Sequence, residues 1–300
     1  MIFAAGLGTR LHPLTEEIPK ALVEVGGQPL LRRVTEKLVA AGILEIVVNV
    51  HHFPEMIRHY LHDHPYPGVT FHISDESGEL LDTGGGLMKA APWLAGDEPV
   101  VVHNVDVISD LDIAALVEYH RQKRAVATLA VRARETQRYL LFDREMRLSG
   151  WMNHQSGEIR RPGPAETSPN RPENKWSMPS DQDLSSSGTA PGSHESAEKA
   201  HCSTAHEPFA LQSEEGSSNS NNEIPGLQKD ELPLAFSGIH VIDPAVFTLV
   251  TRRGRFSLID AYLELAATAP VFGYRDLSPH WIDVGKPDQL RQADEWLSSL

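Results

Sequence analysis

Residues 1–150 alternate between short apolar runs and longer segments with helical spacing. The apolar runs are rich in valine, isoleucine and alanine and predict strands at residues 1–5, 45–50, 69–74, 99–107 and 125–131. Apolar residues recur every three or four positions in the segments between them, which predicts helices at residues 29–42, 54–64, 85–94 and 111–124. This order predicts an α/β fold, Rossmann-like, with a mixed, mainly parallel sheet and helices on both faces.

The composition changes at about residue 154. Residues 154–231 are rich in serine, proline, glycine, glutamate and asparagine and contain few aliphatic side chains. Such a segment buries too little apolar surface to offset the entropy lost on ordering, which predicts a disordered low-complexity insertion. Regular patterns then return, with strands expected at residues 232–242, 270–275 and 281–285 and helices at 244–250, 257–268 and 286–300. We therefore expect one globular domain, made of residues 1–153 and 232–300, which the insertion interrupts.

The charge balance narrows the classes of partner. The chain has 27 lysine and arginine residues against 41 aspartate and glutamate residues, a formal net charge of −14. Such an acidic chain lacks the basic surface that binds nucleic acid or an anionic membrane. No apolar run is long enough to span a bilayer, and no signal peptide is visible. The pattern gives no indication of an oligomeric state.

A single cysteine, Cys202, excludes an internal disulfide and favours the reducing cytoplasm. His201 and His206 flank it inside the predicted insertion. Because no second cysteine-rich half accompanies them, we interpret all three as linker residues and not as a metal site.

A glycine-rich stretch, AAGLGTRLHPLTEEIPK, follows the first predicted strand at residues 4–20. A dinucleotide-binding turn is a poor match, because Leu11 stands where the third glycine would pack strand against helix. Pro13 and Pro19 also predict a long irregular loop with no helix at its start. The GxxxxGK[ST] pattern of a P-loop does not occur in the chain.

Two cations on this loop predict a polyphosphate ligand. Gly6 and Gly8 allow backbone N–H groups to approach phosphate oxygens closely. Arg10 can form bidentate bonds to a phosphate group, and Lys20 adds a compact second charge. Either cation taken alone also fits an exposed surface charge, but the whole pattern favours a binding site.

The stretch resembles the signature of the sugar-1-phosphate nucleotidyltransferases, (A)AGxGTRLxPLTxxxPKxLxxVxxxPLL, over nearly thirty positions. Four later segments are also similar to motifs of this family: LDTGGGLMKA, VVVHNVDVISDLD, FSGIHVI and WIDVGKPDQL. The resemblance covers all but the insertion and implies the nucleotide-diphospho-sugar transferase fold. The TGGG form is most similar to members that act on N-acetylmuramate 1-phosphate or mannose-type 1-phosphates.

The reaction implied by the resemblance joins an NTP to a sugar 1-phosphate, giving NDP-sugar and pyrophosphate, with Mg²⁺ as cofactor. The acceptor's phosphate attacks the α-phosphate in line, so catalysis consists of positioning and charge neutralisation. The resemblance assigns catalytic roles to Arg10, Lys20 and Asp106. Arg10 would stabilise the departing pyrophosphate, and Lys20 would hold the α-phosphate or the attacking sugar phosphate.

The resemblance also implies a metal pair, Asp106 and Asp283. Each follows an apolar run, and Mg²⁺ prefers a few carboxylates together with phosphate and water. A turn or helix-cap carboxylate is the alternative for each. Asp110 is interpreted as a helix N-cap, and Asp112 as a first-turn partner of the helix dipole.

The nucleotide-binding residues implied by the resemblance are Ala4, Ala5, Gly6, Gly8, Thr9, Thr83, Gly84, Gly85 and Asn104. Glycines at residues 84–86 would let a flat base approach the backbone, whereas the alternative is a plain helix N-terminus capped by Asp82 or Thr83. Ser237 and Gly238 are expected to line the sugar pocket.

Two departures from the family pattern affect the acceptor site. Val105 stands where many members have a smaller residue beside the metal aspartate, which would narrow the pocket. The Glu-Lys pair that grips the sugar phosphate in many relatives is absent, so Arg160, Arg161 or no residue replaces it. Two alternative functions stay open: a catalytically silent nucleotide- or sugar-sensing module, and a cytidylyltransferase using a non-sugar phosphate such as phosphocholine.

Overall fold

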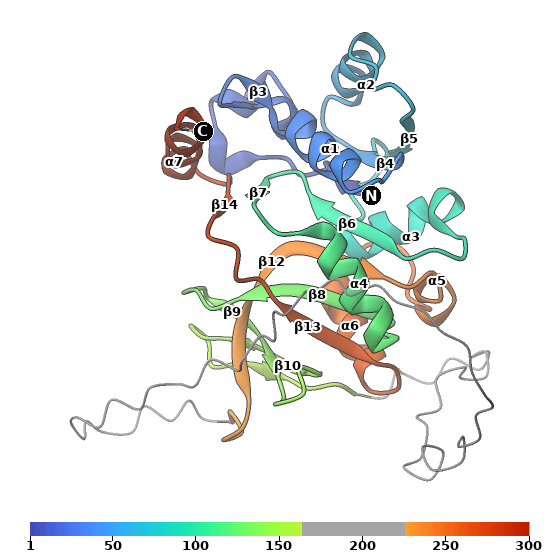
Figure 1. Cartoon of the computed structure of the whole chain (residues 1–300), viewed down its shortest axis with the longest axis vertical. Helices are drawn as coiled ribbons and strands as arrows, with labels where there is room; N and C mark the ends of the chain where they lie inside the picture. Colours follow the sequence, from blue (N-terminus) through green and yellow to red (C-terminus); the bar gives the residue numbers. More distant parts are fainter. Residues whose placement is uncertain (164–225, 300) are drawn as a thin grey trace, which may run out of the picture. The chain divides into compact units, whose positions relative to one another are not determined.

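The first strand, β1 (Ile2–Phe3), lies inside the main sheet between β4 (Glu45–Val50) and β6 (Val100–Asn104) and is parallel to both. Figure 1 shows the computed structural model, in which residues 1–163 and 226–299 are described. A further parallel strand, β5 (Thr70–Asp75), pairs with β4. The four strands predicted first therefore form a parallel sheet.

The rest of the sheet is mixed. One long strand, β12 (Leu232–Ile242), is antiparallel to both β6 and β8 (Ala127–Arg132), and β13 (Val271–Arg275) is parallel to β8. An antiparallel extension continues from β12 through β9 (Arg138–Phe142), β10 (Leu148–Asn153) and β11 (Ile159–Arg160). The predicted mixed α/β sheet is confirmed, with its parallel part made of β6, β1, β4 and β5 and its antiparallel part running from β12 to β11.

Helices cover both faces of this sheet. On one face, Ile46, Val48 and Val50 of β4 share a core with α1 (Leu30–Ala40), α2 (Pro54–Asp63), α4 (Ile113–Lys123) and α7 (Pro287–Ser298). On the other, Val47 shares a core with α3 (Asp82–Leu94), α5 (Val246–Leu249) and α6 (Leu258–Ala266). This division follows from the strand period, because successive side chains point to opposite faces.

The prediction of one strand at residues 99–107 is wrong, because two short strands lie there with a turn between them. The first, β6, ends at Asn104, a turn holds Val105 and Asp106, and β7 (Val107–Ser109) follows. Because β7 pairs antiparallel with β14 (Trp281–Asp283), the turn is brought beside the segment around Asp283. A second short ladder joins β2 (Glu24–Val25) to β3 (Gln28–Pro29).

The interpretation of Asp110 as a helix cap is wrong. The N-cap of α4 is Asp112, whose Oδ1 accepts a hydrogen bond from the Ala115 N–H at 3.0 Å. Asp110 instead lies 2.6 Å from Nδ1 of His280. The helix begins two residues later than the prediction requires, so the cap role passes to the second aspartate.

Residues 164–225 lie outside the described residues, and with them the predicted disorder, Cys202, His201 and His206. The flanks of the predicted insertion are part of the fold, since β11 pairs with β10. Arg161 donates to both carboxylate oxygens of Glu231 and to the Gly226 carbonyl, joining the two flanks. All described residues fall in one compact unit. Within that part of the chain, no helix has the length and apolar character needed to cross a membrane.

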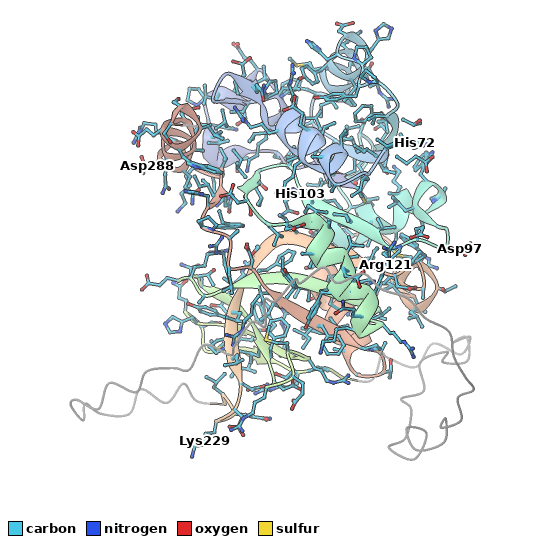
Figure 2. The ribbon with its side chains drawn as sticks, in the orientation of Figure 1. His72, Asp97, His103, Arg121, Lys229 and Asp288 are labelled. Carbon is cyan, nitrogen blue, oxygen red and sulfur yellow. The ribbon has the colours of Figure 1, made fainter. Side chains whose placement is uncertain are left out.

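Three buried histidines predict a dependence of stability on pH. Burial lowers the pKa of His103 and His120 to about 4 and that of His240 to about 3. His103 lies on β6 (Figure 2). His240 is packed among the rings of Phe3, Phe236 and Tyr262, and neither of its ring nitrogens has a hydrogen-bond partner among the described residues.

A histidine with a lowered folded-state pKa binds more protons when unfolded, so its stabilisation is complete above about pH 6.5 and is lost as the pH falls towards the folded-state pKa. We expect His240→Leu to reduce the loss of unfolding free energy between pH 7 and pH 5 by about 2 kcal/mol. Urea titrations at the two pH values measure this, with the exposed His62→Leu as control. An unchanged pH dependence in His240→Leu would contradict the assignment.

Candidate active site

The loop after β1 contains no regular α-helix. Residues 4–23 pass through three short 3-10 turns, η1 (Thr9–Leu11), η2 (Leu14–Glu16) and η3 (Lys20–Leu22). Gly8 has φ +65°, and a Cβ there would lie 2.9 Å from the Thr15 methyl group. The Thr15 hydroxyl donates to the Gly8 carbonyl at 2.8 Å, which closes the loop on itself. The irregular loop expected from Pro13 and Pro19 is thus present.

This loop carries Lys20 to the turn that follows β6. Lys20 is buried, with 7% of its surface exposed, and its Nζ lies 2.5 Å from Oδ2 of Asp106. A buried ammonium group requires such a partner, because removal from water disfavours its charged form. The two residues are 86 positions apart in the sequence and were both predicted as site residues.

Asp283 approaches the same turn from β14. Its neighbour Val284 donates a backbone hydrogen bond to the Asp106 carbonyl at 2.7 Å. Burial raises the pKa of Asp283, and the Asp106 carboxylate raises it further, while the charges of Lys20 and Arg10 oppose the shift. Its Oδ1 is buried with no hydrogen-bond partner among the described residues. Two carboxylates, one carrying an unpartnered buried oxygen, form a donor set suited to a hard divalent cation.

Arg10 lies next to this carboxylate pair. A Cβ placed on Gly285 would lie 2.7 Å from Nη2 of Arg10 and 2.9 Å from Oδ1 of Asp283. The absence of a side chain at Gly285 therefore leaves room for the guanidinium group. This end of the site brings two cations and two carboxylates together, and we refer to it as the phosphate end.

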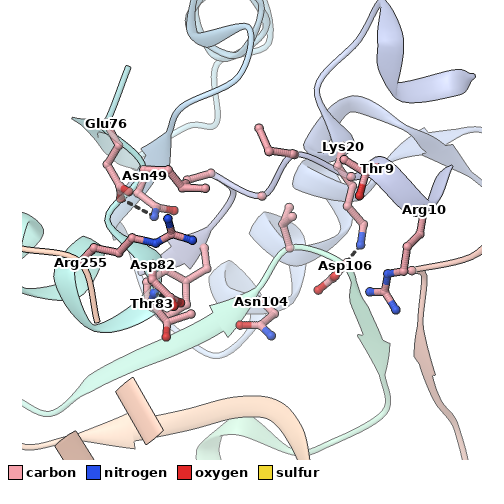
Figure 3. Close-up of a pocket in the computed structure, with 18 residues that line it drawn as sticks. Thr9, Arg10, Lys20, Asn49, Glu76, Asp82, Thr83, Asn104, Asp106 and Arg255 are labelled. Carbon is pink, nitrogen blue, oxygen red and sulfur yellow. Dashed lines mark hydrogen bonds and ion pairs between the residues drawn. The ribbon is translucent and has the colours of Figure 1, made fainter. Parts of the chain in front are cut away.

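A cavity of about 470 Å³ extends from the phosphate end (Figure 3). The predicted site residues that line it are Ala5, Gly6, Gly8, Thr9, Arg10, Lys20, Thr83, Asn104 and Asp106. Ala4 is buried behind the wall and donates its N–H to Oδ1 of Asn49 at 2.7 Å. Val105 also lines the cavity, as expected from its place beside Asp106.

Gly84 and Gly85 are not lining residues of this cavity. They lie in the first turn of α3, where both are buried. The Gly84 N–H donates to the Phe256 carbonyl at 2.9 Å, and a Cβ on Gly85 would overlap the Gly254 carbonyl. Packing between α3 and the segment before α6 accounts for these two glycines.

Ser237 and Gly238 lie behind Asn104. Gly238 has φ +78°, and a Cβ there would lie 3.1 Å from Nδ2 of Asn104. Ser237 is fully buried, and its carbonyl accepts a hydrogen bond from Nε1 of Trp281 at 2.8 Å. Neither residue lines the main cavity, and their role in a sugar pocket stays a prediction.

The far end of the cavity contains residues that sequence reasoning missed: Asn49, Glu76 and Arg255. Glu76 is fully buried, and its carboxylate accepts from Nδ2 of Asn49 at 2.7 Å and from the Leu81 N–H at 3.1 Å. Two sequence features could have identified Asn49 and Glu76 as candidate site residues. Asn49 interrupts an otherwise apolar strand, and Glu76 directly follows the next one.

A second cavity, of about 560 Å³, lies over the antiparallel part of the sheet. Three arginines line it, Arg134, Arg138 and Arg160, together with Trp151 and Phe236. The Arg134 guanidinium lies 4.4 Å from the centre of the Trp281 ring, and burial lowers its pKa while the charge of Asp283 opposes this. Arg134 therefore lines the second cavity and packs against Trp281 of β14, the strand that carries Asp283.

The sequence of this chain is similar to those of known nucleotidyltransferases. Residues 1–145 match the family model described as nucleotidyl transferase. Over 110 residues the chain is 46% identical to an N-acetylmuramate alpha-1-phosphate uridylyltransferase of Caulobacter vibrioides, covering 36% of this chain and 45% of the relative. Over 143 residues it is 40% identical to a mannose-1-phosphate guanyltransferase of Yarrowia lipolytica, covering 46% and 39% respectively. The chain thus matches less than half the length of these curated relatives.

Solved structures share the fold over nearly the whole chain. A UDP-glucose pyrophosphorylase from Acinetobacter baumanii aligns with a TM-score of 0.64 and 16% identity, covering 98% of this chain and 90% of that one. An inositol-1-phosphate CTP transferase from T. maritima aligns with a TM-score of 0.61 and 14% identity, covering 99% and 93%. The expected resemblance in sequence and in fold is confirmed.

Proposed function

We propose that this chain, whose residues 1–145 match the nucleotidyl transferase family model, transfers a nucleotidyl group from an NTP to a sugar 1-phosphate. The products are an NDP-sugar and pyrophosphate. The observation that carries the proposal is the ion pair of buried Lys20 with partly buried Asp106, 2.5 Å apart, at the end of a cavity that Arg10 also lines. Cations for phosphate oxygens and carboxylates for a metal ion meet at this one place.

The substrates supply the reacting groups. A phosphate oxygen of the acceptor forms the new bond to the α-phosphorus, while the bond from the α-phosphorus to the α–β bridging oxygen breaks. The electron pair of that bond leaves with pyrophosphate. Because the acceptor supplies the nucleophile, the protein needs no serine, cysteine or histidine for attack.

Lys20 and Arg10 are assigned to charge neutralisation. Lys20 is held rigidly by burial and by Asp106, so its ammonium group is preorganised to meet the α-phosphate or the attacking phosphate. Arg10 is exposed at the mouth of the site and takes the departing pyrophosphate. Fixed charges of this kind stabilise the transition state without reorganisation during the reaction.

Nucleotidyl transferases generally use a divalent metal ion, and we assign Mg²⁺ to Asp106 and Asp283. The unpartnered Oδ1 of Asp283 supports this assignment. The described residues contain no group of three or more histidine, cysteine, aspartate or glutamate side chains able to hold a metal ion. Two carboxylates suit Mg²⁺, which takes its remaining ligands from phosphate and water. When bound, the ion supplies positive charge against the phosphate oxygens.

The acceptor is assigned to the second cavity, with Arg134 in place of the missing Glu-Lys pair. Arg161 forms an ion pair with Glu231. Arg160 donates a hydrogen bond to Asp260 at 2.5 Å, and its guanidinium group stacks on the Trp151 ring. Among the described residues, Arg134 donates to the backbone carbonyls of Glu135 and Phe236 and to no side chain. Its side chain also packs on Trp281, two residues before Asp283, so it is the arginine best placed to meet a phosphate between the two cavities.

A pyrophosphate-release assay tests the proposed function. Four NTPs are paired with a panel of sugar 1-phosphates in the presence of Mg²⁺, with phosphocholine as a non-sugar acceptor. We expect release only when an NTP and a sugar 1-phosphate are both present. Nucleotide binding without release from any pair would instead indicate a sensing module, and release with phosphocholine alone would reassign the acceptor.

A further inference from the structure

The segment between α5 and α6 docks directly on the start of α3. The Gly84 N–H donates to the Phe256 carbonyl at 2.9 Å, and the Phe256 N–H donates to the Leu81 carbonyl at 3.2 Å. A third bond runs from the Leu258 N–H to the Thr83 hydroxyl at 2.9 Å. These three bonds fix the segment at Phe256 and Leu258, directly after Arg255.

The glycines of α3 make this close docking possible. A Cβ on Gly84 would overlap the Phe256 ring, and a Cβ on Gly85 would overlap the Gly254 carbonyl. Since no side chain separates helix and segment, the backbone at Gly254 and Phe256 rests on α3. Arg255 lies between these two residues and lines the main cavity, with its guanidinium group directed into it (Figure 3).

The two ends of the cavity differ in charge. The phosphate end holds two cations, Arg10 and Lys20, and two carboxylates, Asp106 and Asp283, whereas the other end holds one cation, Arg255, and two carboxylates, Glu76 and Asp82. The additional cation attracts a triphosphate to the phosphate end, so a nucleotide whose phosphates meet Lys20 places its base at the Arg255 end.

Most polar groups at the base end are already used within the protein. Both oxygens of Glu76 accept hydrogen bonds, and Asn49 is bonded through both its oxygen and its nitrogen. Arg255 differs, because within residues 1–163 and 226–299 its guanidinium group has no hydrogen-bond or ion-pair partner. It is exposed to solvent and free to meet a ligand.

We propose that Arg255 binds the nucleotide base and selects bases with an oxo acceptor, as in guanine and uracil, over bases with an amino group there, as in adenine and cytosine. A guanidinium group has five donors and no acceptor. It pairs with the adjacent acceptors of guanine, or with an oxo group of uracil, but faces an amino donor without forming a bond. This proposal rests on the proposed function and assigns its class of nucleotide.

Calorimetric binding of GTP, UTP, ATP and CTP, each with Mg²⁺ and without acceptor, tests the proposal. The wild type is expected to bind GTP or UTP at least about 10-fold more tightly than ATP and CTP. Arg255→Met should weaken the favoured nucleotide by about 10- to 100-fold and leave ATP and CTP nearly unchanged. Arg255→Lys should restore affinity in part, because it keeps the charge but loses the bidentate geometry.

Arg253→Met is the matched control. Arg253 lies on the same segment but bonds to the Val250 and Arg252 carbonyls and lines a different cavity, so base preference should not change. An equal loss for all four nucleotides in Arg255→Met would place the side chain on the phosphates and overturn the proposal, as would no loss at all. Failure of the wild type to bind any NTP would instead contradict the proposed function.

Discussion

Asp106→Asn is expected to lower kcat/KM for nucleotidyl transfer by at least about 100-fold, since loss of residues that merely support metal ligands already costs about 10- to 100-fold. The change keeps the shape of the side chain and an acceptor oxygen near Lys20 but removes the charge that a divalent cation requires. The remaining activity should need a higher Mg²⁺ concentration for half-saturation. Initial rates of pyrophosphate release across a Mg²⁺ series measure both effects.

Asp283→Asn should behave in the same way, because its buried Oδ1 has no protein partner to lose among the described residues. Asp110→Asn is the control, since this carboxylate lies close in sequence but pairs with His280 away from the cavity. Urea titration of each variant separates loss of activity from loss of folding. Full activity in Asp106→Asn would exclude the metal role assigned to that residue.

Lys20→Met is the second substitution with a large expected effect. Methionine keeps most of the apolar stem in its buried position but removes the ammonium group 2.5 Å from Asp106. Loss of one preorganised charge at a transition state lowers kcat by about 100- to 1,000-fold, and we expect a fall in this range. The effect should fall mainly on kcat, because the transition state gains more from Lys20 than the bound substrates do.

Steady-state kinetics with both substrates varied checks this expectation. Lys89→Met is the control, because Lys89 is a lysine of α3 that bonds to the Asp75 carbonyl and does not line the main cavity. A rise in KM with unchanged kcat would show that Lys20 serves binding alone. That result would exclude a catalytic role for Lys20.

The parallel half of the fold was predictable because its strands are buried on both faces. Segments such as residues 45–50 form continuous apolar runs, and the helices between them show clear spacing. The turn at Asp106 was not predictable, since apolar residues continue on both sides of it. The pairing of β7 with β14 decides where β6 ends, and that pairing joins segments about 170 residues apart.

The phosphate end of the site was predictable because its residues come from short, contiguous patterns. Arg10 and Lys20 share one loop, and Asp106 lies in the turn that follows β6 at the same edge of the sheet. The base end comes from three separate segments. The register of β4 with β5 brings Asn49 beside Glu76, and the docking of the segment before α6 adds Arg255. Asn49 and Glu76 can each be singled out in the sequence, but no local pattern predicts that they meet Arg255.

The fate of the acceptor's phosphate distinguishes nucleotidyl transfer from hydrolysis of the NTP. A sugar 1-phosphate labelled with ¹⁸O on its phosphate is incubated with an NTP, Mg²⁺ and the protein, and the products are followed by ³¹P NMR. Attack by the acceptor on the α-phosphorus predicts an NDP-sugar with ¹⁸O at the bridge between its two phosphorus atoms and a pyrophosphate free of label. Release of unlabelled NMP, or of NDP with inorganic phosphate, and no labelled NDP-sugar would exclude nucleotidyl transfer to the sugar 1-phosphate.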